Sequence, residues 1–294
     1  MPQFRLISER ITIVTAANDS YSLCLAVMLR SLEYYLDLNK CDYITVFVFE
    51  DGLSESSKHW IRSSLVSGAL DLHFLKVYPG NTARLRISHH VTKETYFRLL
   101  IENMLFAYNK VIYLDADMVV LRDISDLWNI PFNNSWLLAA PEVSKEGSFA
   151  GSKSGIASYR EVGMSPSAPI FNAGVMVIDL KKWRENNVSQ RVIDYLFRYK
   201  NTVRWWDQEG LNVILVNKWT PLQHQWNVLN GLFRDYKQWN ESRFSRCEYE
   251  LMANAPYIIH YNTNIKPWHK DYPYPLREYF FAFVDQTVWR NWRP

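Results

Sequence analysis

The first half of the chain alternates short apolar runs with stretches of helical spacing. The apolar runs stop at turn-forming residues, as buried strands do, and cover residues 11–17, 43–49 and 70–77. Apolar side chains at the spacing of an amphipathic helix cover residues 21–38, 54–65 and 95–106. This alternation predicts an α/β fold with a mostly parallel sheet flanked by helices. Ligands of such a sheet bind at the carboxyl ends of its strands.

The pattern is less regular in the second half. Strands are expected over residues 136–140 and 170–180, and a helix over residues 188–199. Residues 147–167 are rich in Gly and Ser and show no period. A connection of that length is typical of a lid or binding loop, with plain surface disorder as the alternative. No internal repeat or low-complexity linker marks a domain boundary.

Composition excludes several classes of protein. The chain has 294 residues, 48% of them hydrophobic, and a net charge of +3 that is too small to indicate a nucleic-acid partner. The cysteines Cys24, Cys41 and Cys247 are far apart and form no CxxC pair, so neither a disulfide framework nor a structural zinc site is expected. We also find no signal peptide and no membrane-spanning stretch. These features favour a cytoplasmic protein.

Two carboxylates end an apolar run. Asp115 and Asp117 are separated by one small residue, and in a strand both side chains point to one face. Such oxygen ligands suit a divalent cation, and a cation suits a diphosphate; a polar turn after a strand is the alternative. His260 opens a later loop that also holds Lys266. A lone histidine is usually structural, but with these neighbours it is a candidate metal ligand.

Two further segments offer polar groups beside small residues. Asn172 precedes Ala173 and Gly174, which would let a ligand approach the backbone closely, although a bulge before a strand also explains them. Asp207 and Gln208 stand at the expected start of a helix. There, an N-cap aspartate is the simpler explanation of Asp207. Neither segment is diagnostic alone.

Together, in this order along the chain, these segments resemble glycosyltransferase family 8, whose members are retaining, metal-dependent enzymes that use sugar nucleotides. The likeness is closest to bacterial lipopolysaccharide galactosyl- and glucosyltransferases, with glycogenin more distant. A single Asp-x-Asp is a weak motif. The combination that makes the resemblance specific is Tyr96-Phe-Arg98, Asp115-Ala-Asp117, Phe171-Asn-Ala-Gly174, Asp207-Gln208 and His260…Lys266-Pro-Trp268.

The resemblance implies a GT-A fold, which is a Rossmann-like sheet with a C-terminal extension. The catalytic domain would cover residues 1–270, with its nucleotide-binding part at about 1–120 and its sugar and acceptor part at about 121–270. Residues 271–294 would form an aromatic and basic tail. A helix of that composition is typical of segments that lie on an anionic membrane surface, here the inner face; a helix packed on the domain with a solvated basic edge is the alternative.

The resemblance also implies roles for individual residues. Asp115, Asp117 and His260 would bind Mn²⁺, since an imidazole shifts preference from Mg²⁺ toward Mn²⁺. The UDP-sugar donor would contact Ala16, Asn18, Arg98, Ala116, Asn172, Ala173, Gly174 and Lys266. The acceptor would contact His90, Glu142 and Trp205. Gln208 and Asp207 are the catalytic candidates. We expect front-face transfer, with double displacement through Asp207 as the alternative.

Three positions depart from the family pattern. Asn18 stands where the family often has aspartate, Ser20 where it has asparagine, and Thr263 where it has glycine. A threonine would be strained if that position needed a positive φ. The predicted function is retaining transfer of galactose or glucose from a UDP-sugar to a glycan or glycolipid.

Two other functions would also use a metal-bound sugar nucleotide. A non-catalytic sugar-nucleotide-binding protein would be expected to have lost a metal ligand, and all three are present. A metal-dependent nucleotide-sugar phosphohydrolase or pyrophosphorylase would want a Gly-rich phosphate loop after the first strand. Residues 16–20 are not such a loop.

Overall fold

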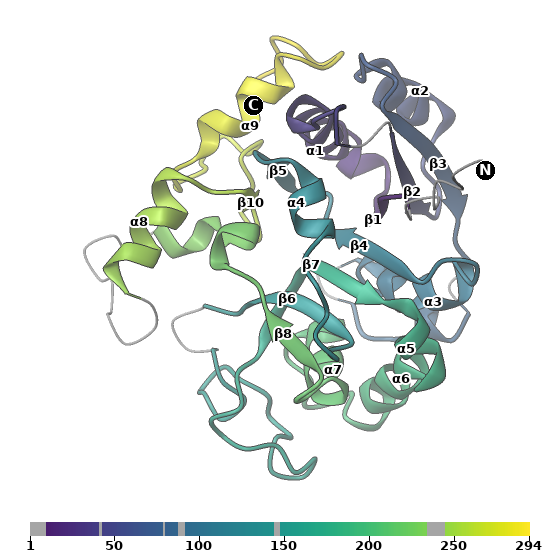
Figure 1. The fold of residues 1–294 in the computed structure, drawn as a ribbon, viewed down its shortest axis with the longest axis vertical. Helices are drawn as coiled ribbons and strands as arrows, with labels where there is room; N and C mark the ends of the chain where they lie inside the picture. Colours follow the sequence, from purple (N-terminus) through teal and green to yellow (C-terminus); the bar gives the residue numbers. More distant parts are fainter. Residues whose placement is uncertain (1–9, 41–42, 79, 88–91, 144–147, 234–244) are drawn as a thin grey trace, which may run out of the picture.

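The structure is a computed structural model that describes residues 10–40, 43–78, 80–87, 92–143, 148–233 and 245–294. A seven-stranded sheet has the order β3-β2-β1-β4-β7-β6-β8 (Figure 1). Its strands are β1 (Thr12–Ala16), β2 (Ile44–Glu50), β3 (Leu70–Lys76), β4 (Lys110–Leu114), β6 (Leu137–Pro141), β7 (Phe171–Asp179) and β8 (Trp219–Pro221). All of them run parallel except β7, which is antiparallel to both of its neighbours. The predicted mostly parallel α/β sheet is confirmed.

Helices cover both faces of this sheet, which explains the unbroken apolar runs of its strands. One face packs against α1 (Ser22–Tyr35), α2 (Glu55–Ser63) and α4 (Ile124–Trp128). The other packs against α3 (Ile101–Met104), α5 (Leu180–Glu185), α6 (Val188–Arg198) and α7 (Trp206–Ile214). Neighbouring residues of one strand enter different cores, as Ile13 and Val14 of β1 do. Both faces of the central strands are therefore buried, whereas the edge strands β3 and β8 are partly exposed.

A second, three-stranded sheet positions the site. It consists of β5 (Met118–Val120), β9 (Val228–Leu229) and β10 (Ile258–His260), with β10 in the middle. Strand β10 runs antiparallel to β5, so that His260 pairs with Met118, and the amide of Tyr261 donates to the carbonyl of Asp117 at 3.0 Å. The pairing carries His260 to the Asp117 backbone, although 143 residues separate the two in sequence. Helix α8 (Arg246–Asn254) comes before β10, and α9 (Arg277–Val284) follows β10 near the end of the chain.

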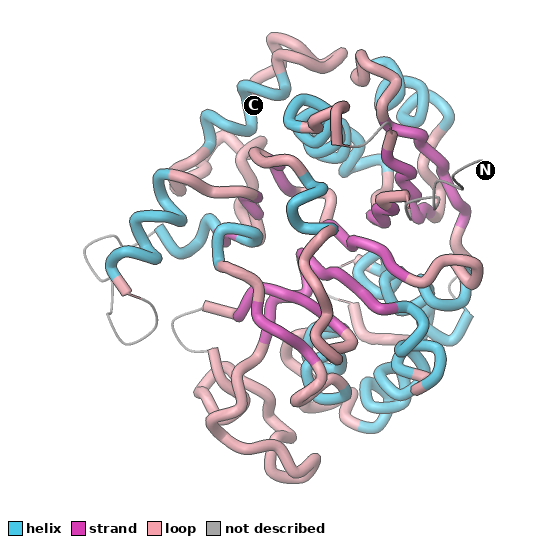
Figure 2. Tube along the Cα trace, viewed as in Figure 1, coloured by secondary structure: helices cyan, strands magenta, loops and turns pink. Residues whose placement is uncertain are grey.

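Short 3-10 helices complete the fold and account for one difference from prediction. They are η1 (Asp19–Tyr21), η2 (Gly80–Arg84), η3 (Lys93–Leu100), η4 (His224–Asn227) and η5 (Asn230–Phe233). The helix expected over residues 95–106 is η3 followed by one turn of α3, so most of it has the tighter 3-10 winding. Residues 148–167 form no helix or strand, as predicted (Figure 2), and the lid role stays a prediction.

The C-terminal tail packs on the domain. Phe280 and Phe283 of α9 are 1% and 5% exposed, and the ring of Phe283 lies 5.7 Å from that of Tyr34 on α1. Arg293 forms an ion pair with Asp285 at 2.8 Å. This is the packed-helix alternative, and membrane contact through the tail finds no support here. In the part of the chain that is described, no helix has the length and apolarity that crossing a membrane requires. The division at residue 270 stays a prediction.

Candidate active site

A cavity of about 780 Å³ opens at the carboxyl edge of the large sheet. Residues that follow β1, β4 and β6 line it, as expected for parallel strands. The first residues of β7 join them, because an antiparallel strand begins at the edge where its neighbours end. The start of α7 and the loop after β10 close the other side. Both sheets therefore contribute to one site.

Every predicted site residue within the described part of the chain lines this cavity. These residues are Ala16, Asn18, Arg98, Asp115, Ala116, Asp117, Glu142, Asn172, Ala173, Gly174, Trp205, Asp207, Gln208, His260 and Lys266. His90 lies outside the described residues. The structure brings the predicted set together; the role of each member stays a prediction.

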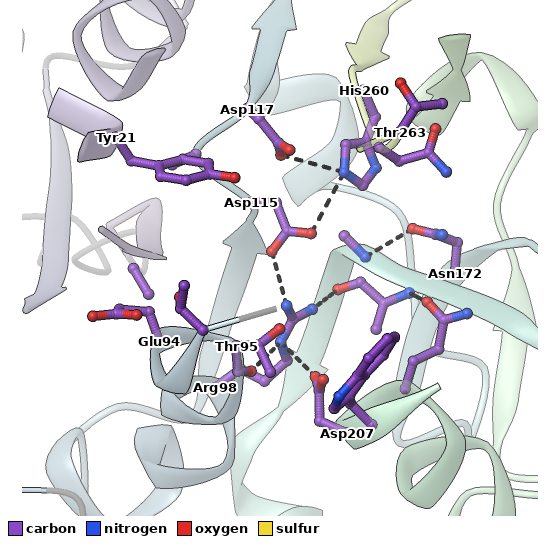
Figure 3. Close-up of a pocket in the computed structure, with 18 of the residues that line it drawn as sticks. Tyr21, Glu94, Thr95, Arg98, Asp115, Asp117, Asn172, Asp207, His260 and Thr263 are labelled. Carbon is purple, nitrogen blue, oxygen red and sulfur yellow. Dashed lines mark hydrogen bonds and ion pairs between the residues drawn. The ribbon is translucent and has the colours of Figure 1, made fainter. Parts of the chain in front are cut away.

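Asp115, Asp117 and His260 form a compact cluster. One ligand atom of each lies within 4.8 Å of the others, and Nε2 of His260 is 3.5 Å from Asp115 Oδ2 and 3.3 Å from Asp117 Oδ1 (Figure 3). The strand geometry expected for the two aspartates is wrong. Strand β4 ends at Leu114, and both carboxylates stand in the bend before β5. The bend, not strand alternation, turns them toward the same point.

A chain of amides decides which nitrogen of His260 faces the carboxylates. The backbone N–H of Gly174 donates to Oδ1 of Asn172 at 3.0 Å, so this oxygen is an acceptor. It also accepts from Nδ2 of Asn227 at 2.9 Å, which turns Oδ1 of Asn227 toward Nδ1 of His260, 3.0 Å away. In the neutral imidazole, Nδ1 therefore carries the proton and Nε2 presents its lone pair to the carboxylates.

This electronic arrangement fits a divalent cation. A lone pair facing two carboxylates is repulsive unless a positive charge lies between them. Two oxygens and one imidazole nitrogen are a donor set that Mn²⁺ accepts. Although burial raises the pKa of Asp117, the ammonium of Lys266 lowers it overall, so this carboxylate is ionised. Lys266 lies 2.5 Å from Asp117 Oδ2 and donates to the carbonyl of Tyr261 at 2.7 Å.

Arg98 ties the metal cluster to the start of α7. This buried guanidinium places Nη2 2.9 Å from Asp115 Oδ1 and Nε 2.8 Å from Asp207 Oδ2, the latter as an ion pair without hydrogen-bond alignment. Its Nη1 donates to the carbonyl of Ala173, and its face lies 4.4 Å from the ring centre of Tyr113. All three guanidinium nitrogens of Arg98, the predicted donor-binding arginine, therefore contact other parts of the protein. Arg98 thus supports the site from within the fold.

Asp207 is not the N-cap of its helix. Helix α7 begins at Trp206 with Trp205 as its N-cap, and the Asp207 side chain turns inward to Arg98 instead (Figure 3). A local pattern cannot reveal a long-range ion pair, so the simpler explanation was wrong. Burial is the main cause that raises the pKa of Asp207 to about 6, with Arg98 opposing it.

A hydrogen-bonded triplet forms the wall on the side of α7. Oε1 of Gln208 accepts from the backbone amide of Ala173 at 3.0 Å. Oε2 of Glu142 accepts from Asn172 Nδ2 at 3.0 Å and from Gln208 Nε2 at 3.4 Å. The triplet joins β6, β7 and α7. Trp205, which is 36% exposed, donates from its indole to the Ser154 carbonyl and so links the irregular segment 148–167 to this wall.

Thr263 fits the loop where the family has glycine. Its φ is not among the positive values found in the chain, so a threonine is not strained there. Its hydroxyl donates to the carbonyl of Ile265 at 2.7 Å. A threonine is therefore accommodated at this position without backbone strain.

Several residues of the site were not predicted from the sequence, and four of them bear on the chemistry. Tyr21, Glu94 and Tyr113 line the cavity, and Asn227 supports His260 from behind. Tyr21 and Tyr113 stand within a few residues of predicted strand ends, which was a usable signal. Glu94 and Asn227 lie in 3-10 helices and carry no local signal.

The fold and the site together define a glycosyltransferase. A family model described as "Glycosyl transferase family 8" matches residues 12–272. The chain belongs to this family and is a glycosyltransferase with a GT-A fold.

The chain is also similar to individual curated proteins and to a solved structure. The chain is 26% identical to "General stress protein A" of Bacillus subtilis (strain 168), over 96% of either chain. It is 24% identical to "Lipopolysaccharide 1,2-glucosyltransferase" of Escherichia coli (strain K12), over 86% of this chain and 70% of that one. The crystal structure of the galactosyltransferase LgtC in complex with donor and acceptor sugar analogues superposes with a TM-score of 0.79 at 26% identity, covering 95% and 96% of the two chains.

Proposed function

We propose that this glycosyltransferase moves a hexose, galactose or glucose, from a UDP-sugar to a glycan or glycolipid, with retention and with Mn²⁺ as cofactor. The observation that carries the proposal is the cluster of Asp115, Asp117 and His260, whose donor atoms face one point at the cavity wall. The hexose is supported by the glucosyltransferase and galactosyltransferase relatives. A cytoplasmic location stays a prediction from the sequence, and membrane contact is not part of the proposal.

The metal ligands would be Asp115, Asp117 and His260. When bound, Mn²⁺ supplies Lewis-acid stabilisation to the UDP leaving group. Lys266 lines the same part of the cavity and adds a fixed positive charge for the diphosphate. Arg98 and Asn227 hold the ligands in orientation, through Asp115 and His260 respectively.

The contacts of the two catalytic candidates support front-face transfer. Double displacement needs a carboxylate that is free to attack the anomeric carbon. Asp207 is buried and paired with Arg98, and Gln208 uses its amide oxygen on Ala173. Neither is a free nucleophile, so the donor phosphate is the base we propose for the acceptor hydroxyl. Gln208 would orient the transferred sugar through its Nε2, with Asn172 beside it.

Acceptor binding is proposed along the wall that carries Glu142 and Trp205. The half-exposed indole of Trp205 offers a flat apolar face for a sugar ring, and Glu142 offers an acceptor oxygen for hydroxyls. His90 remains a candidate from the sequence. Donor and acceptor would then meet between the metal cluster and α7.

A panel of UDP-sugars, with and without Mn²⁺, tests the proposal. UDP-galactose or UDP-glucose should turn over with Mn²⁺ and stop with EDTA. Asp115→Asn and Asp117→Asn should abolish turnover. Asp126→Asn is the matched control, because it removes only surface ion pairs with Arg122 and Lys40.

Each alternative function has its own outcome in this panel. Failure to turn over any nucleotide sugar would favour the non-catalytic binding protein. Metal-dependent hydrolysis that no glycan acceptor diverts into transfer would favour the phosphohydrolase.

A further inference from the structure

Glu94 is a buried carboxylate on the cavity wall that the activity described so far does not use. It lies one turn before Arg98 in η3, is 7% exposed and lines the cavity. Its Oε2 is fully buried and has no hydrogen-bond partner among the described residues. The neighbouring Lys93 directs its ammonium to Asp51 instead. Burying an unpaired carboxylate is unfavourable, so such a group in a cavity marks a place where a ligand supplies a donor.

The position of Glu94 is opposite the sugar side of the site. Figure 3 shows Glu94 and Tyr21 on one side of Asp115, and Asn172 and Asp207 on the other. Burial, and then nearby charges that include Asp117, Asp115 and Glu94, raise the pKa of Tyr21. The phenol therefore lies close to the two aspartates of the metal cluster and to Glu94. With the diphosphate at the metal cluster and the hexose toward Asp207, the nucleoside extends toward Glu94.

Asn18 offers a hydrogen-bond donor to the same cavity in which Glu94 offers an acceptor. Its Oδ1 accepts from the amide of Ser20 at 3.1 Å and from the Ser20 hydroxyl at 2.6 Å, which uses both lone pairs to cap η1. Its Nδ2, on a residue that lines the cavity, makes no hydrogen bond within the described ranges. Asn18 therefore offers a donor and no acceptor. The pairing edge of uracil has a donor, N3–H, between two carbonyl acceptors.

We propose that Glu94 accepts a hydrogen bond from the N3–H of uracil while Asn18 donates to a uracil carbonyl, so that Glu94 selects uracil over cytosine. The inference rests on the proposed UDP-sugar donor and names the residue that reads its base. In cytosine, N3 is an acceptor and repels a carboxylate. Glutamine at position 94 keeps the shape, loses the charge and offers a donor to cytosine N3.

Calorimetric titration of the full chain with UDP, dUDP and CDP, in the presence of Mn²⁺, tests this. Wild type should bind UDP at least about tenfold more tightly than CDP. Glu94→Gln should weaken UDP and dUDP about tenfold in parallel and leave CDP unchanged or tighter. The ligand-free variant should also melt at a higher temperature than wild type, because an unpaired buried charge is removed. A purely structural role would lower the melting temperature.

Glu102→Gln is the matched control. Glu102 is also a buried carboxylate with an unpartnered Oε2, but it does not line the cavity. Its variant should keep the wild-type ratio of UDP to CDP affinity. The base contact would be overturned if Glu94→Gln lost affinity for UDP and CDP equally. It would also be overturned if the variant lost affinity for UDP but not for dUDP. A wild-type chain that binds no uridine nucleotide would overturn the proposed function as well.

Discussion

Replacing Gly174 with alanine should disable the metal site while the sheet stays folded. An added Cβ would lie 2.4 Å from Cε1 and 2.7 Å from Nδ1 of His260, whereas ordinary contacts begin at 3.4 Å. Gly174 does not have a positive φ, so the effect is a side-chain clash and not backbone strain. Relief requires the imidazole to retreat by about 1 Å, the difference between 3.4 and 2.4 Å.

That displacement is large for a metal ligand. Ligand distances tolerate deviations of about 0.2 Å. His260 also cannot turn freely, because Nδ1 is held by Asn227. We therefore expect Mn²⁺ affinity to fall about 10–100-fold. Overpacking should lower the free energy of unfolding by about 1–3 kcal/mol. Manganese titration followed by electron paramagnetic resonance measures the first quantity, and urea unfolding the second.

Gly210→Ala is a control with a comparable clash away from the metal. Its Cβ would lie 2.8 Å from Cγ1 of Val192, within the core between α6 and α7. It should lose stability and keep Mn²⁺ affinity. The reasoning is refuted if Gly174→Ala binds Mn²⁺ as wild type does, or if both variants lose the metal equally.

Three other substitutions test the supports of the site and the fold. Asn227→Leu removes the acceptor for His260 Nδ1 and should weaken Mn²⁺ binding about 10–100-fold in the same titration; unchanged affinity would contradict the tautomer argument. Arg98→Met leaves the buried Asp207 and the partly buried Asp115 uncompensated and should lower the free energy of unfolding by about 3–5 kcal/mol in urea, and a loss near zero would exclude the bracing role. Burial alone would raise the pKa of Glu33, but hydrogen bonds from Ser67 and others lower it below its ordinary 4.5. Glu33→Gln should therefore lower the free energy of unfolding by about 1–3 kcal/mol at pH 7. The difference in this free energy between wild type and variant should shrink as the pH falls below about 4.5, because the wild-type carboxylate becomes protonated. A difference that does not change with pH would show that ionisation of Glu33 is irrelevant.

Much of the fold was predictable because the large sheet is buried on both faces. Strands such as β1 and β2 are continuous apolar runs, and helices of regular spacing separate them. Their order along the chain implies parallel pairing and a site at the carboxyl edge. The antiparallel β7 carries no local sign of its direction, since only its neighbours in the sheet define it.

The candidate site was predictable as a set of residues, through the resemblance, but not as a set of contacts. Asp115 and Asp117 were placed on a strand and stand in a bend. Asp207 had the position of an N-cap and pairs with Arg98 instead. Propensity and spacing report on neighbours in sequence, and these interactions join residues far apart in it.

The sequence by itself determined the β–α order, the strand ends and the residue types that can bind a metal diphosphate, because these depend on local pattern and side-chain chemistry. Only the tertiary structure decided which atoms face one another. The pairing of β10 with β5 brings His260 to Asp117, and the Gly174–Asn172–Asn227 chain orients its ring. Hydrogen-bond saturation and burial are properties of the surroundings in space, so they exist only once the chain has folded.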